Sequence, residues 1–294
     1  MLRSSWSLAR ETVSNFMENN GLSRGAAIAF YAVTSIGPVL LLIVAVAGLA
    51  LGEDAARGAL MDRLRGVMGT QSAEFLQTAI GSASNRGSGV LATIIGLVSL
   101  IITASGVFGE MQSALNTIWR AQPAGDTVTQ LVRARLTSLG LVVALGFLLL
   151  VSLVIGAAIA ALGHALGQIM PFTEMLLHLL NTAISLAMLG VIIAAVYKVL
   201  PDTHIAWRDV IVGSLVTAAL ISVGKVAIGI YIGETGIASS YGAAGSVLAS
   251  LFWIYYSAQI FLLGAEFTHA YARRHGTRAA QRTEARKAEA TSAR

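Results

Sequence analysis

One charged residue lies inside a long apolar stretch of the sequence and is the first candidate for chemistry. Lys225 falls within LVTAALISVGKVAIGIYIG, residues 215–233, with apolar or small neighbours on both sides. A charge at membrane depth costs free energy, so such a residue is a functional hypothesis by default. Three interpretations are open: a substrate or ion site, a structural ion pair, or a lysine whose amine reaches the water at the membrane surface.

Polar residues on neighbouring stretches could surround this lysine. Lys225 lies about 10 Å below the outer end of its predicted helix, at 1.5 Å per residue. In residues 175–199 the three- and four-residue spacing of several polar side chains places them on one helical face. We therefore expect a polar cavity, open to the outer side, that is lined by Lys225, Asn181, Ser185, His178, Tyr255 and Tyr231.

A second ionisable group is expected at the inner ends of the helices. Glu110 ends one apolar stretch and Glu266 closes another, while arginines flank a third stretch. Two acids and several arginines at one level predict structural ion pairs that tie helix ends together, and a proton- or ion-coupled gate is the alternative. The cluster comprises Glu110, Asn116, Arg120, Arg133, Arg135 and Glu266.

The composition indicates that membrane helices hold both groups. The chain of 294 residues is 55% hydrophobic and 12% charged, with a mean hydropathy of +0.73, whereas soluble domains are about 25% charged. Six stretches reach the roughly 20 residues that a helix needs to cross the hydrocarbon core. We predict an all-α, polytopic bundle with six transmembrane helices at about 26–51, 90–110, 138–162, 175–199, 210–232 and 246–268.

The distribution of Lys and Arg predicts the orientation of the chain. Fifteen of them fall in the segments before span one, between spans two and three, between spans four and five, and after span six. Four lie on the opposite side, all in the loop 53–89, and Lys225 completes the 20. Basic residues accumulate on the cytoplasmic side. We therefore expect both termini in the cytoplasm, with a membrane domain over 26–268 and a basic, disordered tail over 269–294.

Outside the spans, helical spacing predicts further elements. Residues 1–25 form a cytoplasmic amphipathic segment with Trp6, Val13, Phe16 and Met17 on one face. This helix either lies on the inner membrane surface or packs on the bundle. The first outer loop, 53–89, should form two short helices.

Two features of the spans themselves are readable from the sequence. Pro38 predicts a kink or break in span one, because proline removes a helical hydrogen bond. Small residues four apart, at 156 and 160 and at 242 and 246, predict close helix packing.

The residues argue against several classes of enzyme. The chain has no cysteine, and its five histidines are scattered, without a paired His or Asp motif that could hold a metal. A phosphate-binding Gly-rich loop followed by Lys is absent, and no stretch outside the spans is long enough for a catalytic domain. We expect no enzymatic activity, no cofactor, no metal and no nucleic-acid partner.

Four blocks of sequence carry a resemblance to a known family. They are AIAFYAVTSIGPVLLL, ALNTIWRA, YKVLPDTHIAWRDVIVGSLVTAAL and YGAAGSVLASLFWIYYSAQIFLLGAEF. In this order they resemble the YihY/BrkB family of bacterial inner-membrane proteins, over roughly residues 10–270. The resemblance implies six spans. The family is named partly after a virulence factor, and its members have carried a ribonuclease label, which the scattered histidines argue against.

These observations predict a membrane function. We expect a protein of the bacterial inner membrane that transports or binds a lipid-like or small polar envelope substrate. Its partners would be membrane lipids and further copies of the chain. The competing hypothesis is a non-transporting scaffold or envelope-assembly factor, in which the polar residues only fix helix packing.

Overall fold

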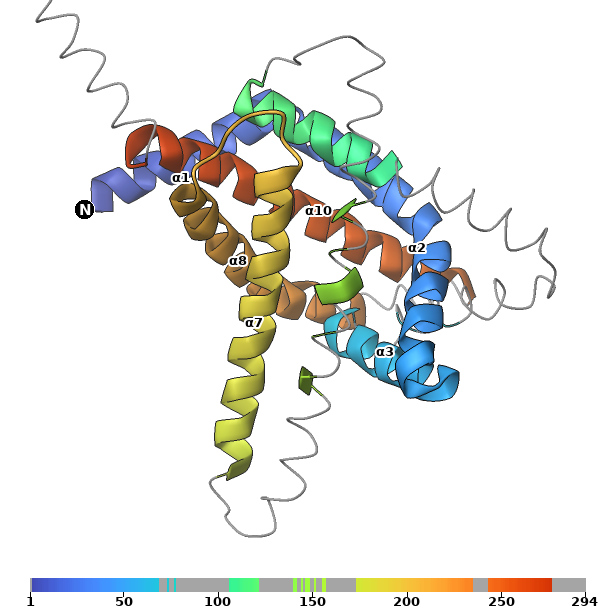
Figure 1. Cartoon of the computed structure of the whole chain (residues 1–294). Coiled ribbons are helices and arrows are strands. Elements are labelled where there is room, and N and C mark those ends of the chain that lie inside the picture. Colours follow the sequence, from blue (N-terminus) through green and yellow to red (C-terminus); the bar gives the residue numbers. More distant parts are fainter. Residues whose placement is uncertain are drawn as a thin grey trace, which may run out of the picture.

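The computed structural model consists of helices and the short connections between them in the part of the chain that it describes (Figure 1). No strand occurs among these residues, so the all-α prediction is confirmed for them. The described residues are 2–68, 73, 77, 106–121, 140–141, 144, 146–148, 151, 155–156, 173–234 and 243–276.

Within the described ranges, three helices are long and apolar enough to cross a membrane. They agree with the last three predicted spans, while the predicted spans at 90–110 and 138–162 lie largely outside the described residues. A further helix covers residues 106–119. The named helices are α1 (Leu2–Glu18), α2 (Gly21–Leu51), α3 (Glu53–Met68), α7 (Thr173–Val199), α8 (Trp207–Glu234) and α10 (Ala243–Arg274), of which α7, α8 and α10 contain the candidate spans.

The core of the described bundle lies where α7, α8 and α10 meet. Tyr197 of α7 is fully buried there, and its hydroxyl donates a hydrogen bond of 2.6 Å to the carbonyl oxygen of Phe261 on α10. The same hydroxyl lies 3.2 Å from the hydroxyl of Thr217 on α8. One buried tyrosine therefore joins three membrane helices, and its polar atom is satisfied inside the bundle, as an apolar interior requires.

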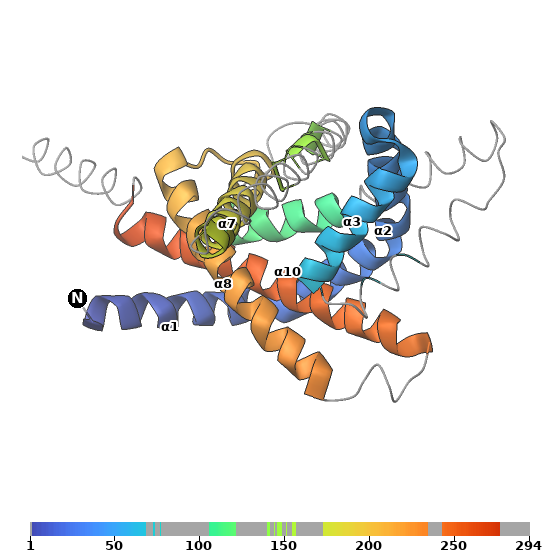
Figure 2. The same cartoon turned by 90° about the horizontal axis from the view of Figure 1, so that it is seen from below.

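The helices α8 and α10 cross in close contact (Figure 2). A Cβ atom added to Gly213 of α8 would collide with the side chain of Thr268 on α10, and one added to Gly264 of α10 would collide with Thr217 on α8. Each threonine hydroxyl bonds the carbonyl of the glycine one turn earlier on its own helix. Small residues at both positions therefore let the two backbones approach.

Helix α1 packs along the end of α10. Glu11 forms ion pairs with Arg274 at 2.5 Å and with Arg273 at 3.8 Å. Phe16 is buried in the core, whereas Trp6 is 74% exposed and Val13 is also exposed. The predicted apolar face is therefore divided between the bundle and its surroundings. Helix α10 continues to Arg274, so the first residues of the expected tail, 269–274, are helical and packed because α1 covers them.

The first predicted span lies in one continuous helix. Helix α2 runs without a break from Gly21 to Leu51, through the position of Pro38, and Figure 1 shows it bending along its length. A kink at Pro38 itself stays a prediction. Helix α3 follows directly in the segment where two short helices are expected, and the second of these lies largely outside the described residues.

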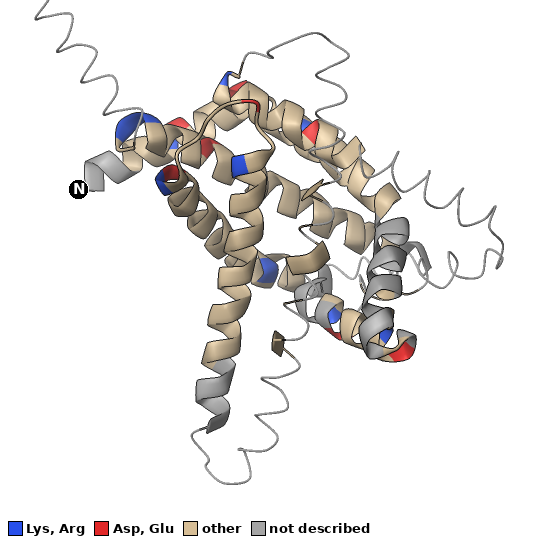
Figure 3. Cartoon of the chain, in the orientation of Figure 1, with Lys and Arg blue, Asp and Glu red and all other residues tan. Residues whose placement is uncertain are grey.

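Charged residues gather at two ends of the described structure (Figure 3). One group lies where α1, the start of α8 and the ends of α7 and α10 meet, and the other lies on α3. The first group coincides with segments expected in the cytoplasm. The orientation across the membrane stays a prediction.

Candidate functional site

A tight turn between α1 and α2 positions the centre of the inner polar cluster. Asn20 adopts the left-handed conformation (φ 55°, ψ 40°), which asparagine enters more readily than most residues. Gly21 then begins α2, where a Cβ atom would collide with the ring of Phe16. The turn therefore places Asn19 and Arg24 on either side of one bend, within reach of other helices.

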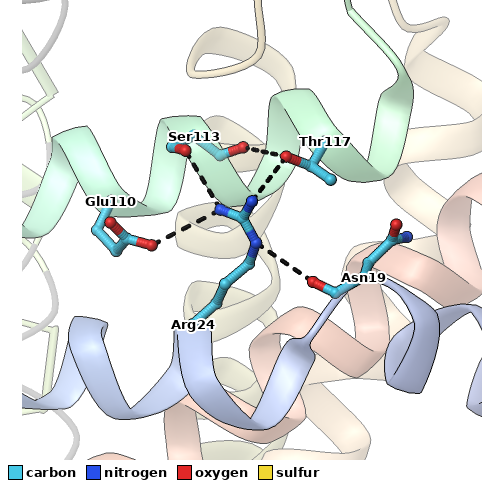
Figure 4. Close-up of polar contacts among 5 residues, drawn as sticks. All are labelled: Asn19, Arg24, Glu110, Ser113 and Thr117. Atoms are coloured by element: carbon cyan, nitrogen blue, oxygen red, sulfur yellow. Dashed lines mark hydrogen bonds and ion pairs between the residues drawn. The ribbon is translucent and has the colours of Figure 1, made fainter.

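Arg24 is the hub of this cluster (Figure 4). Its guanidinium donates to the hydroxyls of Ser113 at 3.2 Å and Thr117 at 3.0 Å, and its Nε donates to the carbonyl oxygen of Asn19 at 3.2 Å. The carboxylate of Glu110 lies 3.7 Å away. The planar fork of arginine can satisfy several acceptors at once, which the single amine of lysine cannot do in this geometry.

Asn19 extends the network to a buried carboxylate. Its side-chain amide donates a hydrogen bond of 2.6 Å to Glu266 Oε1. Glu266 is 1% exposed, and its second oxygen, Oε2, has no hydrogen-bond partner in the described part of the chain. A buried carboxylate with one unsatisfied oxygen is energetically expensive. We therefore regard Glu266 as the most unusual ionisable group of the described bundle.

The structure brings together only some of the residues predicted for the inner cluster. Glu110 and Glu266 enter one network, but Arg24 and Asn19, which the sequence did not nominate, connect them. Arg120 is exposed and ends the helix at 106–119 with a positive φ of 52°. The predicted residues Arg133 and Arg135 lie outside the described residues.

Asn116 binds a residue outside the predicted inner cluster. Its side-chain N–H donates to Asp202 Oδ2 at 2.8 Å, and its side-chain oxygen Oδ1 accepts from the backbone N–H of Asp202, also at 2.8 Å. Gln112 adds a third hydrogen bond to the same carboxylate at 3.1 Å. Asn116 therefore fastens the connection between α7 and α8 to the helix at 106–119.

The residues of the predicted outer cavity lie on α7, α8 and α10. Lys225 is on an exposed face of α8, and Tyr231 packs its ring edge-on against Phe252 of α10, with centroids 6.4 Å apart. The remaining described members, Asn181, Ser185 and Tyr255, are partly buried, and the side chain of His178 lies outside the description. The cavity itself stays a prediction.

A groove of about 600 Å³, which the sequence did not indicate, runs between α1, α8 and α10. Its walls are mainly apolar, and the α10 residues that line it lie between Leu263 and Tyr271, which is in the last turn of the helix. The lining residues are Leu8, Ala9, Thr12, Val13, Val216, Leu220, Leu263, Phe267, Tyr271 and His275.

Comparison with known proteins identifies the family of the chain. Residues 12–289 match the family described as Virulence factor BrkB. The chain belongs to this family. The match spans all the described helices except the first part of α1, which confirms the resemblance drawn from the four sequence blocks.

Relatives of this BrkB-family chain are named as membrane proteins. It is 28% identical over 268 residues to a UPF0761 membrane protein of Rhodospirillum centenum, covering 89% of this chain and 56% of that protein. It is 30% identical to UPF0761 membrane protein YihY of Salmonella typhimurium, covering 60% of this chain and 58% of that protein. The matched region therefore spans little more than half of either relative. No solved structure matches the chain.

Proposed function

We propose that this BrkB-family protein is a multi-pass protein of the bacterial inner membrane that moves or binds a lipid-like or small polar substrate of the envelope. Glu266 is the observation that carries the proposal. It is a carboxylate buried within a candidate membrane span and has one oxygen without a hydrogen-bond partner among the described residues. Ionisable residues in such positions are rare, and they can mark substrate and ion pathways.

The Arg24 network is the proposed inner gate. Its contacts join the α1–α2 turn, the helix at 106–119 and, through Asn19, the helix α10. The hydrogen bonds of this network all depend on the position of one guanidinium group. Displacing that group would therefore release the inner ends of three helices together. Lys225 is the proposed contact for a polar or anionic group of the substrate on the outer side.

In this proposal the chain is not an enzyme and uses neither a cofactor nor a metal. Its partners are membrane lipids and further copies of itself, with no nucleic acid. Because the chain covers little more than half of the relatives that it matches, these statements concern the helical region alone.

A non-transporting scaffold is the second candidate function. The observation in its favour is the double hydrogen bond between Asn116 and Asp202, which holds a helix connection in place. In a scaffold, the Arg24 network would likewise hold helices in place and would have no role in transport.

The deciding experiment compares Lys225→Met with Val226→Met, its exposed neighbour on α8. Lipids and metabolites that copurify with each variant are identified by mass spectrometry, and transbilayer movement of a fluorescent phospholipid is measured in proteoliposomes. A substrate-handling protein loses copurified ligand or movement in Lys225→Met at unchanged abundance in the membrane. Loss of abundance with Lys225→Met alone, or identical ligands in both variants, favours the scaffold.

A further inference from the structure

The groove between α1, α8 and α10 is bounded by membrane helices on two of its sides. Val216 and Leu220 come from α8, while Leu263, Phe267 and Tyr271 come from α10, and both helices contain candidate spans. The helical rise gives the α10 wall, from residue 263 to residue 275, a length of about 18 Å. We expect both helices to cross the bilayer, so an elongated apolar groove between them would lie beside the acyl chains.

One end of the groove is rich in positive charge. It ends at His275, next to Arg273 and Arg274, which share Glu11 of α1 as their acidic partner. Arg10 follows the lining residue Ala9 and is exposed.

The start of α8 lies at the same end of the groove. A Cβ atom on Gly276 would collide with Asp209, so the first turn of α8, with Arg208 and Asp209, adjoins the end of α10. Four arginines therefore face two acids at this end, which favours an anionic group over a cationic one.

The segment that follows α10 does not match the walls of the groove. Residues 277–294 contain no Val, Leu, Ile, Met, Phe, Tyr or Trp. Alanine is the largest aliphatic side chain among these residues, so the segment can bury little apolar surface in the groove. A lipid chain, in contrast, supplies continuous methylene groups at the depth where the groove lies.

We propose that this groove binds one acyl chain of an anionic glycerophospholipid, with its phosphate beside the group formed by Arg10, Arg208, Arg273 and Arg274. The bound lipid would be a resident one that fills the space between the surface helix α1 and the bundle. The groove is separate from Lys225, the contact proposed for the substrate on the outer side, because Val216 and Lys225 are nine residues apart and lie about half a turn round α8 from each other.

The test compares two partly exposed leucines of α8, one that lines the groove and one that does not. Leu220 lines the groove and is 39% exposed, while Leu215 is 50% exposed and lies outside it. Palmitoyl-oleoyl phosphatidylglycerol is titrated into the purified full chain, and bound lipid is counted by native mass spectrometry. Phosphatidylcholine with the same acyl chains is the headgroup control.

We expect Leu220→Trp to weaken phosphatidylglycerol binding at least about tenfold, the effect of losing about two buried methylene groups, and Leu215→Trp to leave it unchanged. Ala9→Trp, on the opposite wall, should act like Leu220→Trp and keeps the test valid if that variant fails to fold. Phosphatidylcholine should bind more weakly to the wild type.

Several outcomes would overturn the proposal. Equal binding by the two leucine variants would mean that the groove is not the lipid site, and equal affinity for the two headgroups would remove the role of the arginines. Tighter lipid binding after deletion of residues 277–294 would show that this segment occupies the groove. A dimer that Leu220→Trp dissociates would show that a second copy does. Phospholipid movement should persist in Leu220→Trp, so failure here is distinguishable from failure of the proposed transport function.

Discussion

Gly213 on α8 lies directly beneath the side chain of Thr268 on α10. The reverse pair, Gly264 on α10 and Thr217 on α8, repeats the contact at the same crossing. In each helix the glycine and the threonine are four residues apart, so both face the partner helix. The two backbones can approach only because neither glycine carries a side chain.

Gly213→Leu should therefore destabilise the bundle more than the same change elsewhere on α8. Overpacking of a tight interior costs about 1–3 kcal/mol. The control is Gly229→Leu, because a Cβ atom there meets no atom within 4 Å. Thermal unfolding of the detergent-purified variants measures the difference, and equal midpoints would show that this crossing is looser than described.

Arg24→Lys should loosen the inner cluster although it keeps the charge. A lysine amine cannot reach Ser113, Thr117 and the Asn19 carbonyl together, so at least one hydrogen bond to a charged group is lost, at about 1.5–3 kcal/mol. Arg65→Lys is the matched control, since its ion pair with Asp62 is exposed on α3. A thermal shift for Arg24→Lys no larger than for Arg65→Lys would contradict the role of the fork.

Glu266→Gln should separate a gating role from a packing role. The amide oxygen of glutamine can still accept the hydrogen bond of Asn19, so we expect abundance in the membrane to persist while phospholipid movement is lost. Glu266→Leu, which leaves the Asn19 amide without its acceptor, should reduce abundance as well. Full movement in Glu266→Gln would exclude the carboxylate from the transport cycle.

Asn19 and Glu266 should also prove energetically coupled. A double-mutant cycle with Asn19→Ala and Glu266→Leu, each of which removes the hydrogen bond, should give an interaction energy of about 0.5–3 kcal/mol, the range for residues in direct contact. Additive effects on thermal stability would argue that the 2.6 Å contact contributes nothing to folding.

Asn116→Ala should free the connection between α7 and α8. The variant loses both hydrogen bonds to Asp202, which at a partly exposed site amounts to about 1 kcal/mol. Limited proteolysis of residues 200–206 should become faster than in the wild type. His204→Ala, in the same connection, serves as the control and should leave the cleavage rate unchanged.

Hydropathy predicted the three candidate membrane helices of the described residues well, because each is a long apolar run and a bilayer requires such a run to be helical. The predicted stretch 175–199 corresponds to α7, and 210–232 corresponds to α8 within a few residues at each end. The end of α10 was missed, because the apolar run stops at residue 268 and His269, Arg273 and Arg274 follow within six residues. They remain helical because α1 packs on them, which is a tertiary effect that no local pattern contains.

The inner cluster was predicted only in part for a related reason. Glu110 and Glu266 were recognisable as acids at the ends of apolar runs, but Asn19 meets Glu266 across 247 residues of sequence. The Asn-Asn-Gly at 19–21 is a turn signal that could have identified the bend. The partners of Arg24 depend on how the helix at 106–119 is rotated. The close crossing of α8 and α10 likewise requires the orientation of both helices.

The contacts between α1 and α10 also constrain the order of assembly. Ser7 bonds Arg274 across 267 residues, and Asn19 bonds Glu266 across 247. At about 5–20 residues per second, a ribosome needs on the order of 10–50 s to add the intervening chain. During this interval the contacts of α1 with α10 cannot form. The α1–α10 contact is therefore among the last to form, after the helices between α1 and α10 have been synthesised.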